Sequence, residues 1–175
     1  SPSLRQRGEL FRKCSDFLTR LDSQPDLTED NKLSLTLRNA SRIVSLPSSE
    51  ATIRGVSGAS LIIEDESARV SDDLYFAIRP MLAVSAGRLI LMSTPFGRQG
   101  HYYEAWTTGD GWEREQVKAV DCPRIPAAFL DEERRGLPDR VYRQEYSCEF
   151  CENEDAVFNL ADFDRLITDD IKPLF

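Results

Sequence analysis

Long apolar runs are absent from this chain of 175 residues. The longest, such as "LILM" at 89–92, cover a handful of positions, whereas a membrane-spanning helix needs about 20. Hydrophobic residues make up 41% of the chain and charged residues 30%, as in an ordinary globular protein. We therefore expect one domain or most of one, with no membrane partner. Because residue 1 is Ser rather than Met, we also expect a piece of a longer protein.

Metal ligands of the zinc type are scarce. His101 is the one histidine, and only four cysteines are present. Cys148 and Cys151 have the C-x-x-C spacing, but no second pair follows, and a structural zinc site usually takes four ligands from two such pairs. We therefore interpret the cysteines as reduced thiols, as expected of a cytosolic protein.

An excess of positive charge is also missing. The net charge is −8, and residues 149–175 carry eight acidic against two basic side chains. Phosphate backbones are bound by clustered cations, so this composition argues against a broad surface that coats nucleic acid. A local contact through arginines remains compatible with the near-neutral main body.

Hydrophobic periodicity and turn residues predict an α/β protein with a strand–helix–strand unit over residues 60–95. Two continuous apolar segments, 60–64 and 88–95, are typical of parallel strands buried on both faces. Turn residues follow the first helix, and Gly87 is expected to end the helix that Ser71 begins. The expected helices are 4–21, one beginning at Ser71 with a new turn at Pro80, a short one after Phe96, 126–135, 138–147 and 162–167; the remaining expected strands are a hairpin of 33–38 with 42–47, and 112–120.

Three carboxylates end the first apolar strand in "LIIEDESARV". Ligands of open α/β folds bind at the carboxyl ends of the strands, and an apolar strand followed by Asp-Glu is the Walker B arrangement. Asp65 would hold Mg²⁺, usually through water, and Glu66 would polarise the water that attacks a γ-phosphate. Glu64 interrupts the apolar run, so it either points to solvent or pairs with a base. The alternative is an acidic turn that caps the next helix.

The second apolar strand ends in Ser93-Thr94-Pro95, at the same rim of the sheet. Hydroxyl groups can bond both a phosphate and a catalytic water, so this turn is a candidate sensor of the γ-phosphate. A plain Ser/Thr–Pro turn is the alternative. No G-x-x-x-x-G-K-[ST] loop occurs, and no glycine is followed by lysine. The loop that cradles the phosphates is therefore expected upstream of Ser1.

Four segments together resemble the large subunit of the tailed-phage terminase, in order from residue 1 to about 160. They are "SPSLRQRGELFRK", "SLPSSEATIRGVSGASLIIEDESARV", "GRLILMSTPFGRQGHYYEAW" and "PDRVYRQEYSCEF". The resemblance implies a P-loop NTPase-type, mostly parallel sheet flanked by helices, incomplete at its N-terminus, with a short β-hairpin. Residues 1–150 would be the C-terminal part of the ATPase domain, and 151–175 an acidic linker toward a missing nuclease domain.

The same resemblance assigns roles to single residues. It places Walker B at Ile62–Glu66, with Asp65 for the metal and Glu66 as the catalytic carboxylate, and makes Ser93, Thr94 and Pro95 the coupling motif. It also makes Arg54 an arginine that acts in trans on a neighbouring subunit's nucleotide. A surface arginine in a loop is the alternative for Arg54, and Arg98 is a rival for the same role.

The implied function is ATP hydrolysis, with Mg²⁺, that drives viral DNA into a procapsid. The implied partners are double-stranded DNA, the terminase small subunit, the portal protein and further copies of the chain in a ring, in the cytoplasm of an infected or lysogenic host. This chain alone is expected to be inactive. Two other functions stay open: another P-loop motor such as a helicase of superfamily 2, and a non-catalytic P-loop-like binding domain.

Two aromatic groups complete the predictions. His101, Tyr102, Tyr103 and Trp106 form a cluster that either stacks on a base or, as we expect, packs inside the protein. Tyr142, Tyr146 and Phe150 are expected to dock their segment on the body and so hold the acidic tail.

Overall fold

The computed structural model describes residues 4–31, 33–46, 53 and 56–152. Contacts divide the chain into two compact units, Ser1–Ser93 and Thr94–Phe175. The first unit contains α1 (Leu4–Leu18), β1 (Leu27–Asp30), β2 (Ser34–Leu37), β3 (Arg42–Val44), β4 (Leu61–Asp65), the 3-10 turn η1 (Ser67–Arg69), α3 (Asp72–Ile78), the 3-10 turn η2 (Arg79–Leu82) and β5 (Arg88–Met92). The second contains α4 (Gly100–Thr107), the 3-10 turn η3 (Ala119–Asp121), α5 (Ala127–Gly136) and α6 (Asp139–Ser147).

The predicted hairpin is confirmed as β2 and β3, which pair antiparallel with Leu35 opposite Ile43. In its turn, the Ser41 amide donates to Asn39 Oδ1 at 3.0 Å, and Ala40 adopts a φ of 64°, a region that glycine adopts more easily than alanine. β1 adds a third, antiparallel strand to this sheet. The sequence did not predict β1, because three of its four residues are polar and all four are exposed, as is common at the edge of a sheet.

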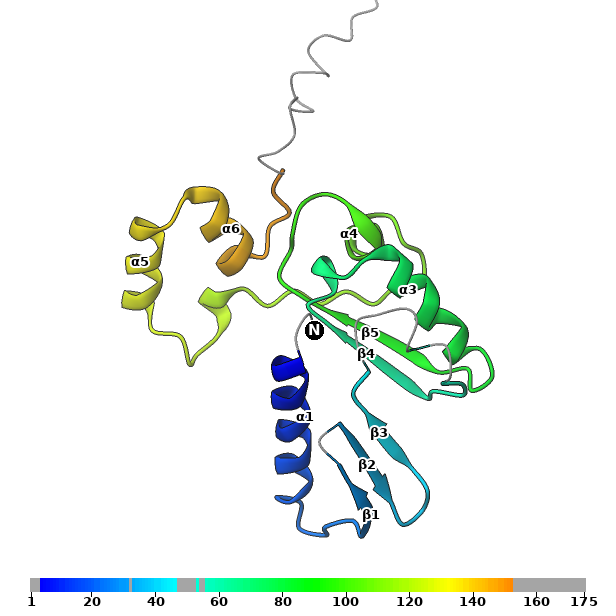
Figure 1. The fold of residues 1–175 in the computed structure, drawn as a ribbon. Coiled ribbons are helices and arrows are strands. Elements are labelled where there is room, and N and C mark those ends of the chain that lie inside the picture. The colour runs from blue at the N-terminus through cyan, green and yellow to red at the C-terminus, as the bar shows by residue number, and fades with distance from the viewer. Residues whose placement is uncertain (1–3, 32, 47–52, 54–55, 153–175) are drawn as a thin grey trace, which may run out of the picture. The chain divides into compact units, whose positions relative to one another are not determined.

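The predicted parallel pair is confirmed as β4 and β5, with Ile63 opposite Ile90 and Asp65 opposite Met92. α3 and η2 cover one face of this pair, as Figure 1 shows. The core on that face consists of Ile53, Leu74, Ile78 and Met81, with Ile62 and Leu89 packed against it.

The expectation that both faces of these strands are buried is wrong for the part of the chain that the structure describes. Leu61, Ile63, Ile90 and Met92 are each more than 40% exposed. Successive side chains of a strand point to opposite faces, and α3 with η2 covers one face only. The open face is therefore an apolar surface. Leu61, Ile63 and Asp65 occupy alternate positions of β4, so Asp65 lies on this same face, at the carboxyl end of the strand.

The helical region ends at Leu82, earlier than the predicted Gly87, and residues 83–86 form a turn that leads to this glycine. Sterics explain the residue type at Gly87. Its amide donates to the Leu82 carbonyl at 3.1 Å, and a Cβ at this position would collide with the carbonyl oxygen of Ala59. The next residue, Arg88, starts β5 by donating to the Ser60 carbonyl at 3.0 Å. The predicted new turn at Pro80 is the 3-10 turn η2.

The second unit confirms the short helix after Phe96 and both later helices, but residues 112–118 form no strand. Arg114, a residue of this segment, instead donates its side-chain hydrogen bonds to nearby backbone carbonyls. Arg114 Nε donates to the Ala105 carbonyl at 3.0 Å, and its other nitrogens reach the Gly109 and Trp112 carbonyls. The helix expected over 162–167 and the linker over 153–175 lie outside the described residues. None of the described helices is long and apolar enough to cross a membrane.

Candidate active site

The candidate site begins where β4 ends. Leu61, Ile62 and Ile63 favour a strand because β-branched and aliphatic side chains suit a pleated surface. The strand carries Glu64 and Asp65 to its carboxyl end, beside the end of β5. The polar side chains that the sequence predicts for this rim are therefore held by backbone pairing.

Glu64 and Asp65 lie on opposite faces of β4. Glu64 shares the face of Ile62, which packs on the α3 core, and the Glu64 side chain is only 7% exposed. The suggestion that Glu64 points to solvent is therefore wrong, because the alternation of the strand turns it toward α3. Asp65 is partly buried on the open face. Of these two carboxylates, Asp65 is the one placed to meet a ligand.

Glu66 leaves the strand in a left-handed backbone conformation, with φ 56° and ψ 38°. Few residues other than glycine adopt this region, and it costs on the order of 1 kcal/mol. The Glu66 side chain is 50% exposed and its Oε2 lies 3.7 Å from Arg69 Nε. Such an exposed ion pair contributes little stability, so the Glu66 carboxylate remains accessible to water.

Ser93 follows Met92, the register partner of Asp65, and so falls at the same rim as the carboxylates. It is the last residue of the first unit, and Thr94 is the first of the second. Both side chains are partly buried and Pro95 is buried. The strand ends bring Asp65, Glu66 and Ser93 to neighbouring positions, as predicted, while their roles stay predictions.

The two arginine candidates have different outcomes. Arg54 lies outside the described residues, although Ile53 before it is fully buried in the α3 core. Arg98 is engaged within its own unit: its Nε donates to the Phe150 carbonyl at 3.3 Å and its Nη1 lies 3.5 Å from Glu152 Oε1. These contacts, which the sequence did not predict, hold the Arg98 side chain within the second unit, and its rival role in trans stays a prediction.

The C-x-x-C pair does not form a metal site with other described residues. Cys148 Sγ donates to the Val117 carbonyl at 3.3 Å, and Cys151 Sγ contacts the Arg140 carbonyl at 3.8 Å. Burial raises the pKa of the Cys148 thiol, which nearby Lys118 partly counteracts. Within the described ranges, no three His, Cys, Asp or Glu side chains gather as metal ligands.

Comparisons with known proteins agree with this geometry. Residues 1–165 match the family described as "Terminase large subunit, T4likevirus-type, N-terminal". Among solved structures, the chain is similar to the large terminase ATPase domain of Thermus phage P74-26, with a TM-score of 0.60 and 20% identity over 86% of this chain and 74% of that one. A variant of that domain with one arginine replaced by alanine gives a TM-score of 0.66 at the same identity and coverage.

The family match spans nearly the whole chain, and the fold of the solved domains is shared. The helicase alternative is therefore set aside. The chain belongs to the terminase large subunit family, T4likevirus-type, N-terminal part, and has a role in the phage DNA-packaging motor.

Proposed function

We propose that Asp65 and Glu66 are the metal-binding and water-activating carboxylates of an ATPase whose hydrolysis drives double-stranded DNA into a procapsid. The observation that carries the proposal is the position of the two adjacent carboxylates. They end a parallel strand whose neighbour, β5, is followed by Ser93. Ligands of open α/β sheets bind at such strand ends.

The donor atoms at this rim fit Mg²⁺ bound together with a nucleotide. Mg²⁺ prefers oxygen ligands, and it usually takes one or two carboxylates, with water and phosphate oxygens completing its shell. Asp65 supplies such a carboxylate, partly buried at the end of β4. The scarcity of further acidic ligands nearby, among the described residues, argues against an all-protein cage. When bound, Mg²⁺ would neutralise charge on the β- and γ-phosphates.

Glu66 is suited to orient the attacking water. Its left-handed backbone turns the chain away from the axis of β4 directly after Asp65, so the two carboxylates diverge from adjacent positions. The Glu66 carboxylate is half exposed, and among the described residues its one side-chain contact is the long one with Arg69. An accessible carboxylate can accept a hydrogen bond from a water molecule and so direct the lone pair of that water at the γ-phosphorus.

The other assignments complete the proposal. Ser93 and Thr94 would bind the γ-phosphate through their hydroxyl groups, and Arg54 would act in trans on the nucleotide of a neighbouring subunit. A trans-acting arginine requires a ring of subunits. The terminase small subunit and the portal protein are the proposed packaging partners, and the host cytoplasm is the proposed location.

The test is the Glu66→Gln variant of the intact terminase large subunit. The amide keeps the shape of the side chain but cannot accept the proton of the attacking water, so we expect kcat for ATP to fall by about 100-fold or more. Nucleotide affinity should be preserved, because Asp65 is untouched. Steady-state phosphate release and nucleotide titration measure the two quantities.

Glu113→Gln is the matched control, since Glu113 is exposed in the irregular segment 112–118. It should hydrolyse ATP as the wild type does. Near-normal turnover by Glu66→Gln would remove Glu66 from the mechanism. Absence of hydrolysis by the wild type, when DNA and procapsids are supplied, would favour the non-catalytic binding domain.

A further inference from the structure

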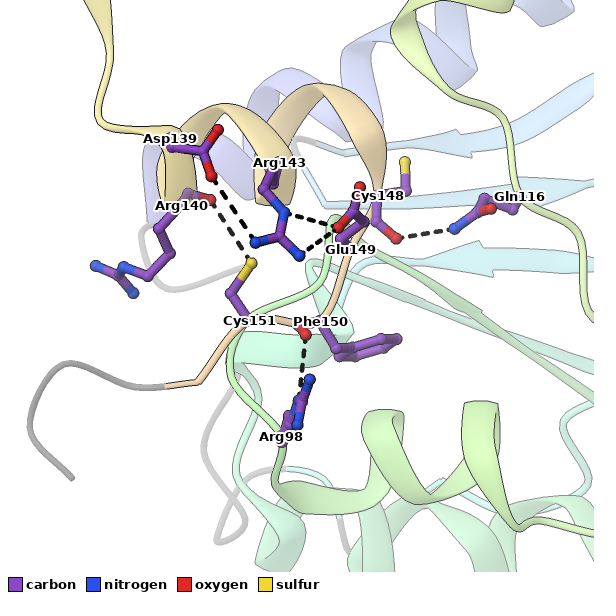
Figure 2. Close-up of polar contacts among 9 residues, drawn as sticks. All are labelled: Arg98, Gln116, Asp139, Arg140, Arg143, Cys148, Glu149, Phe150 and Cys151. Carbon is purple, nitrogen blue, oxygen red and sulfur yellow. Dashed lines mark hydrogen bonds and ion pairs between the residues drawn. The ribbon is translucent and has the colours of Figure 1, made fainter. Parts of the chain in front are cut away.

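The segment Cys148–Glu152, here called the exit strap, is the last described part of the chain and leads into its acidic end. Arg98 contacts this strap twice, through a hydrogen bond to the Phe150 carbonyl and an ion pair with the Glu152 carboxylate. Figure 2 shows the Arg98 guanidinium directed at the backbone of Phe150. The planar guanidinium can reach a carbonyl and a carboxylate at once, which the single ammonium of a lysine does less well.

The Phe150 ring provides a second connection to the same region. Its centroid lies 5.1 Å from the Tyr103 ring, 6.0 Å from Tyr102 and 6.5 Å from Trp106, all on α4. Aromatic pairs at these separations stabilise the packing beyond what the burial of the ring contributes. Thus the loop before α4 holds the Phe150 backbone while α4 itself holds its side chain.

The strap is also held from its other side. Cys148 has a φ of 55° and ends α6, and its carbonyl accepts a hydrogen bond from Gln116 Nε2 at 2.8 Å. Arg143 pairs with Glu149 at 2.7 Å, as Figure 2 shows. This contact raises the pKa of Arg143, chiefly through the hydrogen bond to the Glu149 carboxylate. The strap therefore keeps a fixed connection to α6 as well.

Arg98 is joined to the Ser93–Thr94 turn by a short loop. Three residues separate Thr94 from Arg98, and Pro95 and Gly97 among them are buried. Gly97 and Gly100 flank the arginine with φ values of 72° and 79°, a region that glycine adopts without strain. Arg98 thus lies four residues after Thr94 while its side chain is held by Phe150 and Glu152, so a displacement of the turn would act directly on these contacts.

We propose that Arg98 is a positioning residue that couples the Ser93–Thr94 turn to the exit strap. It passes a change at the turn to the chain beyond residue 152. This inference rests on the proposed function of Ser93 and Thr94. It adds a path by which a conformational change at this turn reaches the exit strap. Arg98 touches neither nucleotide nor metal in this account, so its loss should uncouple hydrolysis from packaging rather than stop hydrolysis.

The experiment compares Arg98→Ala, Arg98→Lys and the control Arg124→Ala in the intact terminase large subunit with procapsids and linear DNA. Arg124 is exposed and makes no ion pair or side-chain hydrogen bond within the described residues. For Arg98→Ala we expect unchanged kcat and KM for ATP, but DNA packaged per ATP reduced about five-fold or more. Arg98→Lys should recover part of this loss, and Arg124→Ala should behave as the wild type.

A milder variant, Glu152→Gln, separates loss of the contact from misfolding of Arg98→Ala, because it removes only the charge of the acceptor. It should lower DNA packaged per ATP in the same direction but by less. Hydrogen exchange at the strap amides should be faster in both Arg98→Ala and Glu152→Gln.

Two results would overturn the proposal. One is unchanged DNA per ATP in Arg98→Ala, and the other is a parallel fall of ATPase and packaging rates, which would give Arg98 a structural or catalytic role. Neither result depends on Glu66. Normal hydrolysis by Glu66→Gln would instead contradict the proposed function while leaving the comparison of Arg98 variants readable.

Discussion

At the scale of single residues, Glu66 combines an unfavourable backbone with an accessible carboxylate. Its φ of 56° lies in a region that glycine occupies without cost, yet the position carries glutamate. Strained backbone tends to collect at functional sites, where the surrounding structure holds it in place. We infer that the side chain of Glu66 is kept for its chemistry at some expense of stability.

This inference predicts an order of stability between two variants. Glu66→Gly and Glu66→Ala both remove the carboxylate and its contact with Arg69, and they differ only in the Cβ. Because the Cβ is the source of the strain, Glu66→Gly should be more stable than Glu66→Ala by about 0.5–1 kcal/mol. Urea-induced unfolding of the two proteins measures the difference. An alanine variant at least as stable as the glycine variant would show that the backbone at residue 66 relaxes.

The residues of the rim show how far sequence reasoning reaches. The apolar run Leu61–Ile63, followed by Asp65 and Glu66, predicted the strand and its polar end, because the pattern is local. The burial of Glu64 was not predicted, since it depends on which face α3 covers. Sequence alone also missed the partners of Arg98, which lie more than 50 residues away in the chain.

At the scale of elements, α5 and α6 are joined by a hydrogen bond and by an aromatic pair, both of which involve Tyr146. Tyr146 Oη donates to Glu133 Oε2 at 2.7 Å, and the Tyr146 ring contacts Phe129 and Tyr142. The hydrogen bond to Glu133 is the main reason that the pKa of Tyr146 is raised. The charged acceptor makes this bond stronger than one between neutral groups.

The prediction at this scale is that Tyr146→Phe destabilises the second unit by about 1 kcal/mol, because Glu133 loses its donor while the ring packing remains. Fluorescence of Trp106 and Trp112 during urea unfolding reports on this unit directly. Tyr103→Phe is the matched control: it also removes one hydroxyl, and Tyr103 Oη makes no hydrogen bond within the described residues. Equal stability of Tyr146→Phe and wild type would mean that the bond contributes nothing net.

The pH dependence of this contribution follows from the raised pKa of Tyr146. A raised folded-state pKa means that the neutral phenol is stabilised by folding. The contribution is therefore fully present below the ordinary tyrosine pKa of about 10 and is lost as pH rises through the folded-state value. The stability difference between wild type and Tyr146→Phe should stay constant near neutral pH and shrink in alkaline solution.

The elements that sequence analysis missed share a physical cause. Residues 112–118 alternate in polarity like a strand, but none of the described strands pairs with them, and Arg114 and Gln116 donate to the Ala105 and Cys148 carbonyls. The reverse holds for β1: its mostly polar sequence does not indicate a strand, and it becomes one by pairing with β2. In both segments, partners distant in sequence decide between strand and loop.

At the scale of the whole molecule, the chain belongs to a family whose members act in DNA packaging, and its two compact units carry different parts of the proposed task. The first unit holds the carboxylates at the end of β4. The second unit contains the aromatic and ionic contacts that hold the exit strap. Ser93 is the last residue of the first unit and Thr94 the first of the second, and their coupling role stays a proposal.

The central claim is a division of labour between two adjacent carboxylates. Titration of the intact protein with a slowly hydrolysed ATP analogue, with and without Mg²⁺, tests it directly. Asp65→Asn should lose about tenfold or more of the affinity that Mg²⁺ confers, because its amide is a poorer metal ligand. Glu66→Gln should bind the Mg²⁺-nucleotide as tightly as the wild type. Wild-type, Mg²⁺-dependent affinity in Asp65→Asn would contradict the account.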